Sequence, residues 1–356
     1  MAAGTSAHDT PPAARRFRTC CAWLFGAVLL TTVIIAALHY SEAQAFVQLA
    51  ENAQPAWLML ALALQFSTYV CEGAIWRLVV TGAGRVLSGA DALRLSLVKL
   101  FLDQAVPSAG LSGTVAVAHA LARLAIGPGA IAAGVVVGLV SYYAAYMVTL
   151  AAALVIAVHY GAGNPVLVGL ALLFIVYALV SSTLALALSG RRASPSGRRH
   201  LRYGPLRKAL DLLEHVDPAL ARSPRLLVYA SALQLAIIGL DVATMAAMLH
   251  ALGASIAPAG VFASVVLANL FRSIGILPGG LGSFEAAAVL TLKAFGVPLA
   301  TALAATLLFR GFSFWLPMLP GLWCSQRMFT AVPRGPMITH AWPASRPGCD
   351  KPMAPL

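Results

Sequence analysis

Charged side chains are scarce in this chain of 356 residues: Asp, Glu, Lys and Arg make up 10% of it, against 60% for hydrophobic residues. Between Leu124 and Gly190 there is no Asp, Glu, Lys or Arg, and the mean hydropathy of the chain is +0.84. Such a composition leaves too little polar surface to cover a water-soluble globule of this size. The sequence therefore predicts an all-α, polytopic membrane protein built as a helical bundle.

Cysteine is also scarce, and the five cysteines have no metal-ligand spacing. The sequence lacks an H-E-x-x-H motif, the paired aspartates of intramembrane proteases and a nucleotide-binding P-loop. We therefore expect no disulfide framework, no metal, no cofactor and no enzymatic activity. One short match stands against this expectation: Gly110-Leu111-Ser112-Gly113 has the G-x-S-G pattern of rhomboid proteases and would need a histidine such as His250. A serine protease is therefore a remote alternative.

The basic residues lie mainly outside the apolar segments. Lys and Arg number 24 and Asp and Glu 12, a net charge of +12 that in a soluble protein would suggest nucleic acid. Here the basic residues gather in three regions, 1–19, 189–225 and 326–356. By the positive-inside rule all three are cytoplasmic. We expect no nucleic-acid partner, and a multi-pass protein of the bacterial inner membrane with both termini in the cytoplasm.

Six apolar segments are long enough to cross a bilayer. They are residues 21–40, 56–80, 129–159, 164–188, 226–250 and 298–323. The chain then divides into a cytoplasmic tail (1–19), a first transmembrane half (20–188), a basic cytoplasmic linker (189–225), a second half (226–325) and a disordered tail (326–356). In the linker Leu206, Leu210, Leu213 and Val216 have helical spacing. This spacing suits a helix on an anionic leaflet, although a solvated loop fits equally well.

Two pairs of shorter apolar segments are each interrupted by proline and glycine. The first pair, 92–126, breaks at Pro107 and Gly110, and the second, 258–297, breaks at Pro278-Gly279-Gly280. Broken backbone at membrane depth is tolerated only inside protein or beside a water-filled cavity. We predict two re-entrant helical hairpins, with two tilted full spans in each place as the alternative.

The two halves also resemble each other in sequence. Lys99-Leu100-Phe101 matches Asn269-Leu270-Phe271, and Ser141-Tyr142-Tyr143 matches Ser313-Phe314-Trp315. Because the span at 56–80 should run inward and that at 226–250 outward, we predict an inverted repeat whose hairpin tips meet near the midplane. The alternative is that two Ala-, Gly- and Leu-rich stretches resemble each other by composition alone.

Arg310 falls near the middle of the segment 298–323, where a charge costs about 2.5–3.5 kcal/mol on translocon scales. Such a residue requires a partner. It either forms a structural ion pair with Glu285 or Asp241, or faces a cavity and binds a phosphate.

Arg272 and Asp103 occupy similar places, each just before the break of its hairpin. Backbone N–H groups freed at the second break can receive an anionic head group, and Glu285 at the start of the following helix can interact with the helix dipole or carry a proton. The candidate substrate-binding residues are Arg310, Arg272, Glu285, Asp103, Asp241, Gly279, Gly280 and Gly282.

Several motifs in the second half carry a family resemblance. They are Pro278-Gly279-Gly280-Leu281-Gly282-Ser283-Phe284-Glu285, Gly296-Val297-Pro298, Ala302, Ala304-Ala305-Thr306, Arg310 and Phe314-Trp315-Leu316-Pro317. They resemble the C-terminal signature of the lysylphosphatidylglycerol synthase transmembrane-region family, flippase-like membrane proteins. Phe101-Leu102-Asp103 to Gly110 resembles the family's first break, but Asp103 stands where members often have Asn, and Leu111-Ser112-Gly113 replaces a Gly-rich acidic step.

The resemblance implies lipid movement without lipid synthesis, since no cytosolic aminoacyl-transfer domain follows the last span. We therefore expect a translocase that moves an amphipathic lipid, anionic or of the polyprenyl-phosphate type, between leaflets. The chain offers no ATP site, so movement is downhill or ion-coupled. The alternative is a membrane scaffold that docks a lipid- or glycan-modifying enzyme through the linker 189–225.

The predicted topology can be tested by cysteine labelling in a background without the native cysteines. Ser196→Cys, in the basic linker, should resist a membrane-impermeant thiol reagent in intact cells, whereas Ala162→Cys, in the predicted outer loop, should react with it. Labelling of position 196 in intact cells would overturn the topology.

Overall fold

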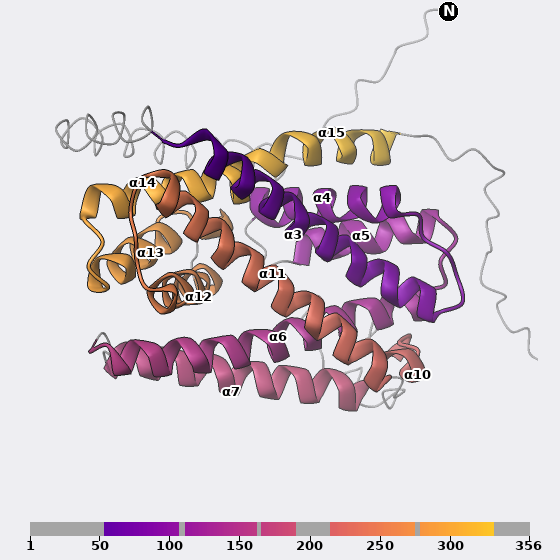
Figure 1. Ribbon diagram of the computed structural model, residues 1–356. Helices are drawn as coiled ribbons and strands as arrows, with labels where there is room; N and C mark the ends of the chain where they lie inside the picture. Colours follow the sequence, from indigo (N-terminus) through magenta and orange to yellow (C-terminus); the bar gives the residue numbers. More distant parts are fainter. Residues whose placement is uncertain (1–52, 107–110, 162–164, 190–213, 275–277, 331–356) are drawn as a thin grey trace, which may run out of the picture.

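The computed structural model describes residues 53–106, 111–161, 165–189, 214–274 and 278–330. Within these ranges the regular structure is helical (Figure 1), as the composition predicted. Five helical stretches are long and apolar enough to cross a membrane: α3 (Pro55–Gly82), α6 (Pro128–His159), α7 (Pro165–Leu188), α11 (Pro224–Ala251) and the run Leu299–Met328. These five coincide with predicted spans, and the sixth, 21–40, lies outside the described residues.

The last of these stretches is not a uniform helix. It consists of α14 (Leu299–Arg310), a π-helical turn η2 (Gly311–Trp315) and α15 (Leu316–Thr330), which contains Pro320. A π-helical turn inserts one residue into an α-helix and is found frequently at functional sites. Here the turn begins directly after Arg310.

Four shorter helices form the two predicted hairpin regions. In the first, α4 (Gly89–Ala105) packs against α5 (Leu111–Arg123), and in the second, α12 (Pro258–Ile274) packs against α13 (Ser283–Ala294). At about 1.5 Å per residue none exceeds about 26 Å, which is short for a hydrocarbon core of about 30 Å. The first break, Pro107 to Gly110, lies outside the described residues, whereas the second contains a short 3₁₀ turn, η1 (Pro278–Gly280). That the hairpins are re-entrant stays a prediction.

The two hairpins lie at opposite ends of the bundle (Figure 1). The long helices α3 and α11 pack antiparallel: the Gln54 N–H, before α3, donates to the Ala251 carbonyl at the end of α11, 3.0 Å away, and Gly82 at the end of α3 lies against Leu226 at the start of α11. Because α4 follows the end of α3 and α12 follows the end of α11, the two hairpins begin at opposite ends.

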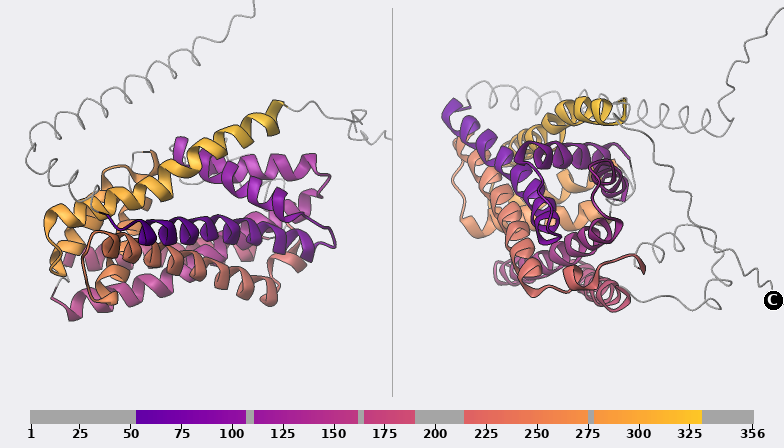
Figure 2. Two further views of the ribbon diagram at one scale, coloured as in Figure 1. Left: turned by 45° about the horizontal axis from the view of Figure 1, so that its top comes forward. Right: turned by 90° about the vertical axis from the view of Figure 1, so that its right-hand side faces the viewer.

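The hairpins are flanked by the long helices (Figure 2). Helix α4 packs on α3 and α15, and α12 packs on α6 and α11. The 3₁₀ turn η1 at the tip of the second hairpin touches α4 of the first. The second tip therefore contacts the first hairpin. The first tip, Pro107 to Gly110, lies outside the described residues, so the meeting of the two tips stays a prediction.

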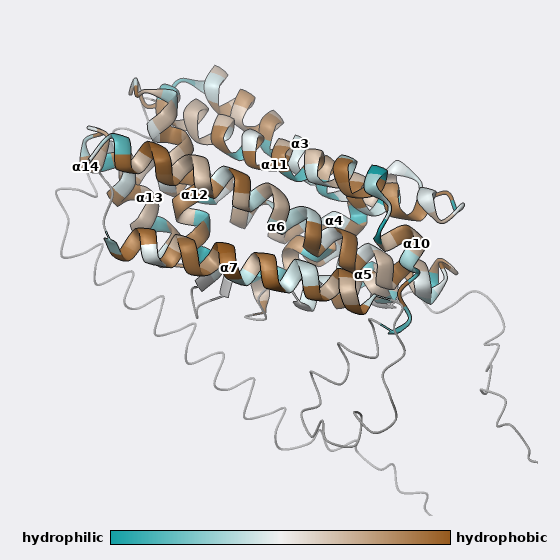
Figure 3. Cartoon of the chain, turned by 90° about the horizontal axis from the view of Figure 1, so that it is seen from below, coloured by the Kyte–Doolittle hydropathy of each residue, from teal (hydrophilic) through white to brown (hydrophobic). Residues whose placement is uncertain are grey.

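Helix α7 lies at the edge of the bundle, beside α6, and is strongly hydrophobic (Figure 3). Leu172, Leu173 and Val176 on this helix are exposed. In a membrane these side chains contact lipid, so their exposure costs nothing there.

The bounds of the helices recur at a constant offset. Each bound of α11 lies 169 positions after that of α3 (55 to 224, 82 to 251), and each bound of α12 lies 169 positions after that of α4 (89 to 258, 105 to 274). The connecting loops match too: Gly84 N–H bonds to the Thr81 carbonyl, and Gly253 N–H bonds to the His250 carbonyl. The offset of 169 pairs Lys99 with Ala268, so the predicted match of Lys99 with Asn269 is shifted by one residue. The correspondences support the inverted repeat, which stays a prediction.

The described end of the linker packs on α6. The Asp217 N–H donates to the Gly129 carbonyl at 3.2 Å before the short helix α10 (Pro218–Ala221), and Val216 is buried with Ala132 and Val136. Val216 is thus in protein rather than on a leaflet surface. The other residues of the predicted surface helix, Leu206, Leu210 and Leu213, lie outside the described residues.

The first hairpin depends on close contact between its legs. A Cβ at Gly113 in α5 would collide with the Lys99 carbonyl oxygen and lie 2.5 Å from Asp103 Oδ1, whereas a Cβ at Gly138 in α6 would meet nothing within 4 Å. Gly113→Ala should therefore lower stability by about 1–3 kcal/mol, and Gly138→Ala should leave it unchanged or raised. Thermal unfolding in detergent compares the two, and equal melting temperatures would contradict this packing.

Candidate functional site

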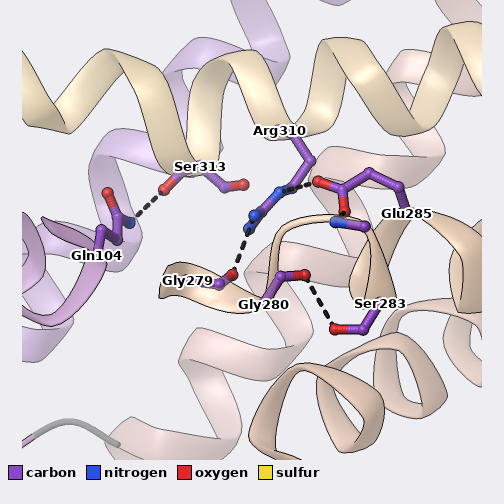
Figure 4. Close-up of polar contacts among 8 residues, drawn as sticks. Gln104, Gly279, Gly280, Ser283, Glu285, Arg310 and Ser313 are labelled. Carbon is purple, nitrogen blue, oxygen red and sulfur yellow. Dashed lines mark hydrogen bonds and ion pairs between the residues drawn. The ribbon is translucent and has the colours of Figure 1, made fainter. Parts of the chain in front are cut away.

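The Arg310 side chain is buried in the interior, with 4% of the residue exposed. Its Nε donates to Glu285 Oε1 at 2.7 Å, and its Nη2 donates to the Gly279 carbonyl at 3.0 Å (Figure 4). Arg310 is the last residue of α14, Glu285 lies in the first turn of α13, and Gly279 lies in η1. One guanidinium therefore holds the long helix to the tip of the second hairpin.

Glu285 holds the tip by its second oxygen. Oε2 accepts the Gly282 N–H at 2.7 Å, which caps the start of α13. A carboxylate at the N-terminus of a helix is stabilised by the unpaired N–H groups there. Glu285 thus has two sources of stabilisation, of which Arg310 is only one.

Two aromatic rings enclose the guanidinium. Arg310 Cζ lies 4.5 Å from the centroid of the Phe314 ring and 5.1 Å from that of Phe284. Cation–π contacts of this kind contribute about 0.5–2 kcal/mol each. Gly279, at φ +61°, carries no Cβ, and one would collide with the Phe314 ring. The turn therefore needs glycine both for its backbone conformation and for its space.

The π-helical turn after Arg310 is tied to the first half of the chain. The Tyr69 hydroxyl on α3 donates to the Phe312 carbonyl at 2.7 Å, and Gln104 Nε2 on α4 donates to the Ser313 carbonyl at 3.2 Å (Figure 4). An interrupted hydrogen-bond ladder leaves carbonyls that need such donors. Tyr69 and Gln104 were not predicted as site residues, since no pattern in the sequence shows which polar side chain will reach a freed carbonyl.

Arg272 lies beside the same tip but outside this ion pair. A Cβ on Gly280 would lie 2.8 Å from Arg272 Cα, so the tip and the α12 leg are in contact. The side chain of Arg272 is exposed, and it forms no ion pair with a described residue, although its charge acts on Arg310 and Asp241. Two arginines therefore approach the tip, one paired and one without an ion pair.

Asp103 belongs to a different cluster. Its Oδ2 lies 3.2 Å from Lys99 Nζ, which lies 3.1 Å from Glu72 Oε1 on α3, and its Oδ1 accepts the Gly113 N–H at 2.8 Å. Asp103 thus joins the legs of the first hairpin. Lys99 was missed as a candidate, although a lysine four residues before a carboxylate in an apolar segment signals such a pair.

Asp241 lies near the middle of α11, beside Gln65 of α3 and within electrostatic range of Arg272. It forms no ion pair with any residue in the described part of the chain. The predicted alternative of an Arg310–Asp241 pair is therefore not what the structure shows: Arg310 selects Glu285.

The residues of the G-x-S-G match have other contacts. The Ser112 hydroxyl donates to the Leu102 carbonyl at 2.8 Å within the first hairpin, and the His250 ring stacks on Trp57 with a centroid distance of 4.9 Å. Both contacts are of ordinary structural kinds.

The Arg310–Glu285 pair should behave as a coupled unit. Glu285→Ala leaves the guanidinium in the interior without its carboxylate, so it should cost about 3–5 kcal/mol of stability. The double change Arg310→Met with Glu285→Ala removes the stranded charge and should cost clearly less than the sum of the single changes. Thermal unfolding of the four proteins in detergent measures this coupling, and simple additivity would mean that the pair contributes no coupling.

Comparison with known proteins assigns the family. The model of the lysylphosphatidylglycerol synthase TM region matches residues 23–321, which include both hairpins and the Arg310–Glu285 pair. No curated protein matches the chain at a significant level. Since the match extends over well over half of the sequence, the resemblance seen in the motifs is confirmed. The chain belongs to the lysylphosphatidylglycerol synthase transmembrane-region family, and is a multi-pass membrane protein with a lipid-related function.

Proposed function

We propose that the protein is a lipid translocase that moves an anionic, phosphate-bearing lipid between the leaflets of the bacterial inner membrane. The observation that carries this proposal is the Arg310 guanidinium, buried at the tip of the second hairpin and held by one carboxylate and one carbonyl. A phosphate offers two oxygens in a geometry that matches the guanidinium fork as a carboxylate does. A lipid phosphate can therefore replace Glu285 as the partner of Arg310.

In this exchange neither Arg310 nor Glu285 loses all of its hydrogen-bond partners. While the site is empty, Glu285 compensates the buried charge of Arg310 at 2.7 Å. When a phosphate takes that place, Glu285 keeps the Gly282 N–H at 2.7 Å and its position at the start of α13. Each state leaves both charges with hydrogen-bond partners, which avoids the large penalty for an unpaired ion in an apolar interior.

The hairpins supply a route for the head group. They begin at opposite ends of the bundle, and the tip of the second lies against α4 of the first. Helical breaks whose polar groups meet in the interior are the arrangement expected for a site reached alternately from two sides. The acyl chains can remain in the lipid while only the head group passes through the protein.

The chemistry of the site limits the partners. A guanidinium selects anions, so the proposed substrates are anionic phospholipids or polyprenyl phosphates. In this proposal the basic linker and both termini lie on the cytoplasmic side, where a lipid- or glycan-modifying enzyme can dock. Movement is downhill or ion-coupled.

Substitution of Arg310 tests the proposal in proteoliposomes that contain a fluorescent phosphatidylglycerol, at equal amounts of folded protein. Arg310→Ala should abolish movement of the probe, and Arg310→Lys should lose most of it, since an ammonium cannot reproduce the bidentate fork. Arg327→Ala is the matched control, because Arg327 is an exposed arginine on α15, stacked on Trp323.

Gel filtration establishes that each variant is folded. Wild-type rates in Arg310→Ala would reduce this arginine to a structural role. Loss of movement in Arg327→Ala as well would mean that general loss of positive charge, rather than the site, explains the effect.

A further inference from the structure

The two halves carry a carboxylate at equivalent positions. Glu72 and Asp241 are separated by 169 positions, the same offset that separates the bounds of α3 from those of α11. Gln65 and Gln234, both buried, are separated by 169 positions as well. Because the two helices are antiparallel, the repeat places the acid of each helix at the depth of the buried amide on the other, so Gln65 of α3 lies level with Asp241 of α11.

The two carboxylates differ in their partners. Glu72 Oε1 lies 3.1 Å from Lys99 Nζ on α4, so its charge is compensated within the first half. The corresponding helix of the second half, α12, carries Arg272, whose charge acts on Asp241 without forming an ion pair. The acid and the base therefore form an ion pair in the first half, whereas the corresponding acid and base of the second half do not.

The carboxyl of Asp241 has no ion-pair partner among the described residues. It lies near the middle of a membrane-spanning helix, and the polar groups that act on it are Arg272 from α12 and Gln65 and Tyr69 from α3. Among the described residues of α6, α10 and α14, which also pack on α11, no charged group acts on Asp241. Arg272 is thus its sole nearby cation in the described part of the chain, and Arg272 is exposed.

The Gln65 amide suits both protonation states of this carboxyl. Gln65 is 3% exposed, its Nε2 donates to Thr68 Oγ1 at 3.0 Å, and its Oε1 is buried without a hydrogen-bond partner among the described residues. An amide can donate to a carboxylate through nitrogen and, after rotation, accept from a carboxylic acid through oxygen. The unused buried acceptor beside Asp241 fits the O–H of a protonated carboxyl.

We propose that Asp241 is the proton-binding residue that couples lipid movement to the proton gradient. This inference rests on the proposed translocase function and adds its driving ion. When the head-group phosphate held at Arg310 also contacts Arg272, which lies at the same hairpin tip, its oxyanion takes over the attraction of the Arg272 guanidinium. Asp241 then takes up one proton from the aqueous phase as its O–H bond forms. One singly charged lipid anion and one proton then cross together, so the step is electrically neutral.

The test uses proteoliposomes of phosphatidylcholine with a trace of fluorescent phosphatidylglycerol, with the membrane potential clamped at zero by potassium and valinomycin. A pH gradient is imposed in either direction, and the share of probe in the outer leaflet is measured by chemical quenching. Wild-type protein should enrich the probe in the leaflet that faces the alkaline compartment. For one proton per lipid the leaflet ratio approaches about tenfold per pH unit.

The key variant is Asp241→Asn, which keeps the shape of the side chain and removes the titration. It should still equilibrate the probe between leaflets but show no response to the gradient. Glu72→Gln is the matched control at the equivalent position, because Lys99 keeps Asp103 as a partner at 3.2 Å. This control should keep the full response.

The outcomes separate the two proposals. If wild-type protein moves no probe under any condition, the proposed function fails and this inference with it. If wild-type protein equilibrates the probe but ignores the gradient, or if Asp241→Asn keeps the response, the coupling inference alone is overturned. If Asp241→Asn does not fold, a second measurement uses wild-type protein in detergent. Short-chain phosphatidylglycerol is added and the uptake of protons is measured. Uptake of about one proton per bound lipid supports the inference, and no uptake overturns it.

Discussion

The rest of the interior depends on the need to pair one buried positive charge. Arg310 lies where water is excluded, so its guanidinium must find acceptors within the protein, and it finds them on the tip of the second hairpin. That contact fixes the tip against the long helix. The tip in turn reaches α4, and the π-helical turn beside Arg310 receives donors from α3 and α4. One pairing requirement thus connects both halves.

The number of positions that separates matched residues of the two halves is not constant along the chain. It increases at the two segments that surround Arg310. The offset is 169 positions up to the ends of α4 and α12. It is 171 for the turns that follow α5 and α13. In these turns the Ile126 N–H donates to the Leu121 carbonyl, and the Val297 N–H donates to the Leu292 carbonyl. Between Ser141 and Ser313 it is 172. The extra residues therefore fall at the hairpin tip and in η2. The Arg310–Glu285 ion pair joins these two places in the second half.

The sequence predicted the class of fold well and the site in part. Charge-free runs bounded by proline and glycine located the five described spans and both hairpin regions, because hydrophobic length and helix breakers act locally. The Arg310–Glu285 pair was one of the predicted alternatives, since a mid-membrane charge demands a partner. Asp103, however, lies with Lys99 and Glu72, and Tyr69 and Gln104 were missed. These contacts depend on packing between helices far apart in sequence, which periodicity does not encode.

The matched helices of the two halves are equal in length but differ in how their charged groups are paired. The cluster of the first half combines Glu72, Lys99 and Asp103 with the Gly113 N–H, so its polar groups are already occupied. In the second half Asp241 and Arg272 remain apart. In the proposed translocase, the first half would thus serve as a support, and the second half would keep a cation and an acid for the lipid anion and the proton.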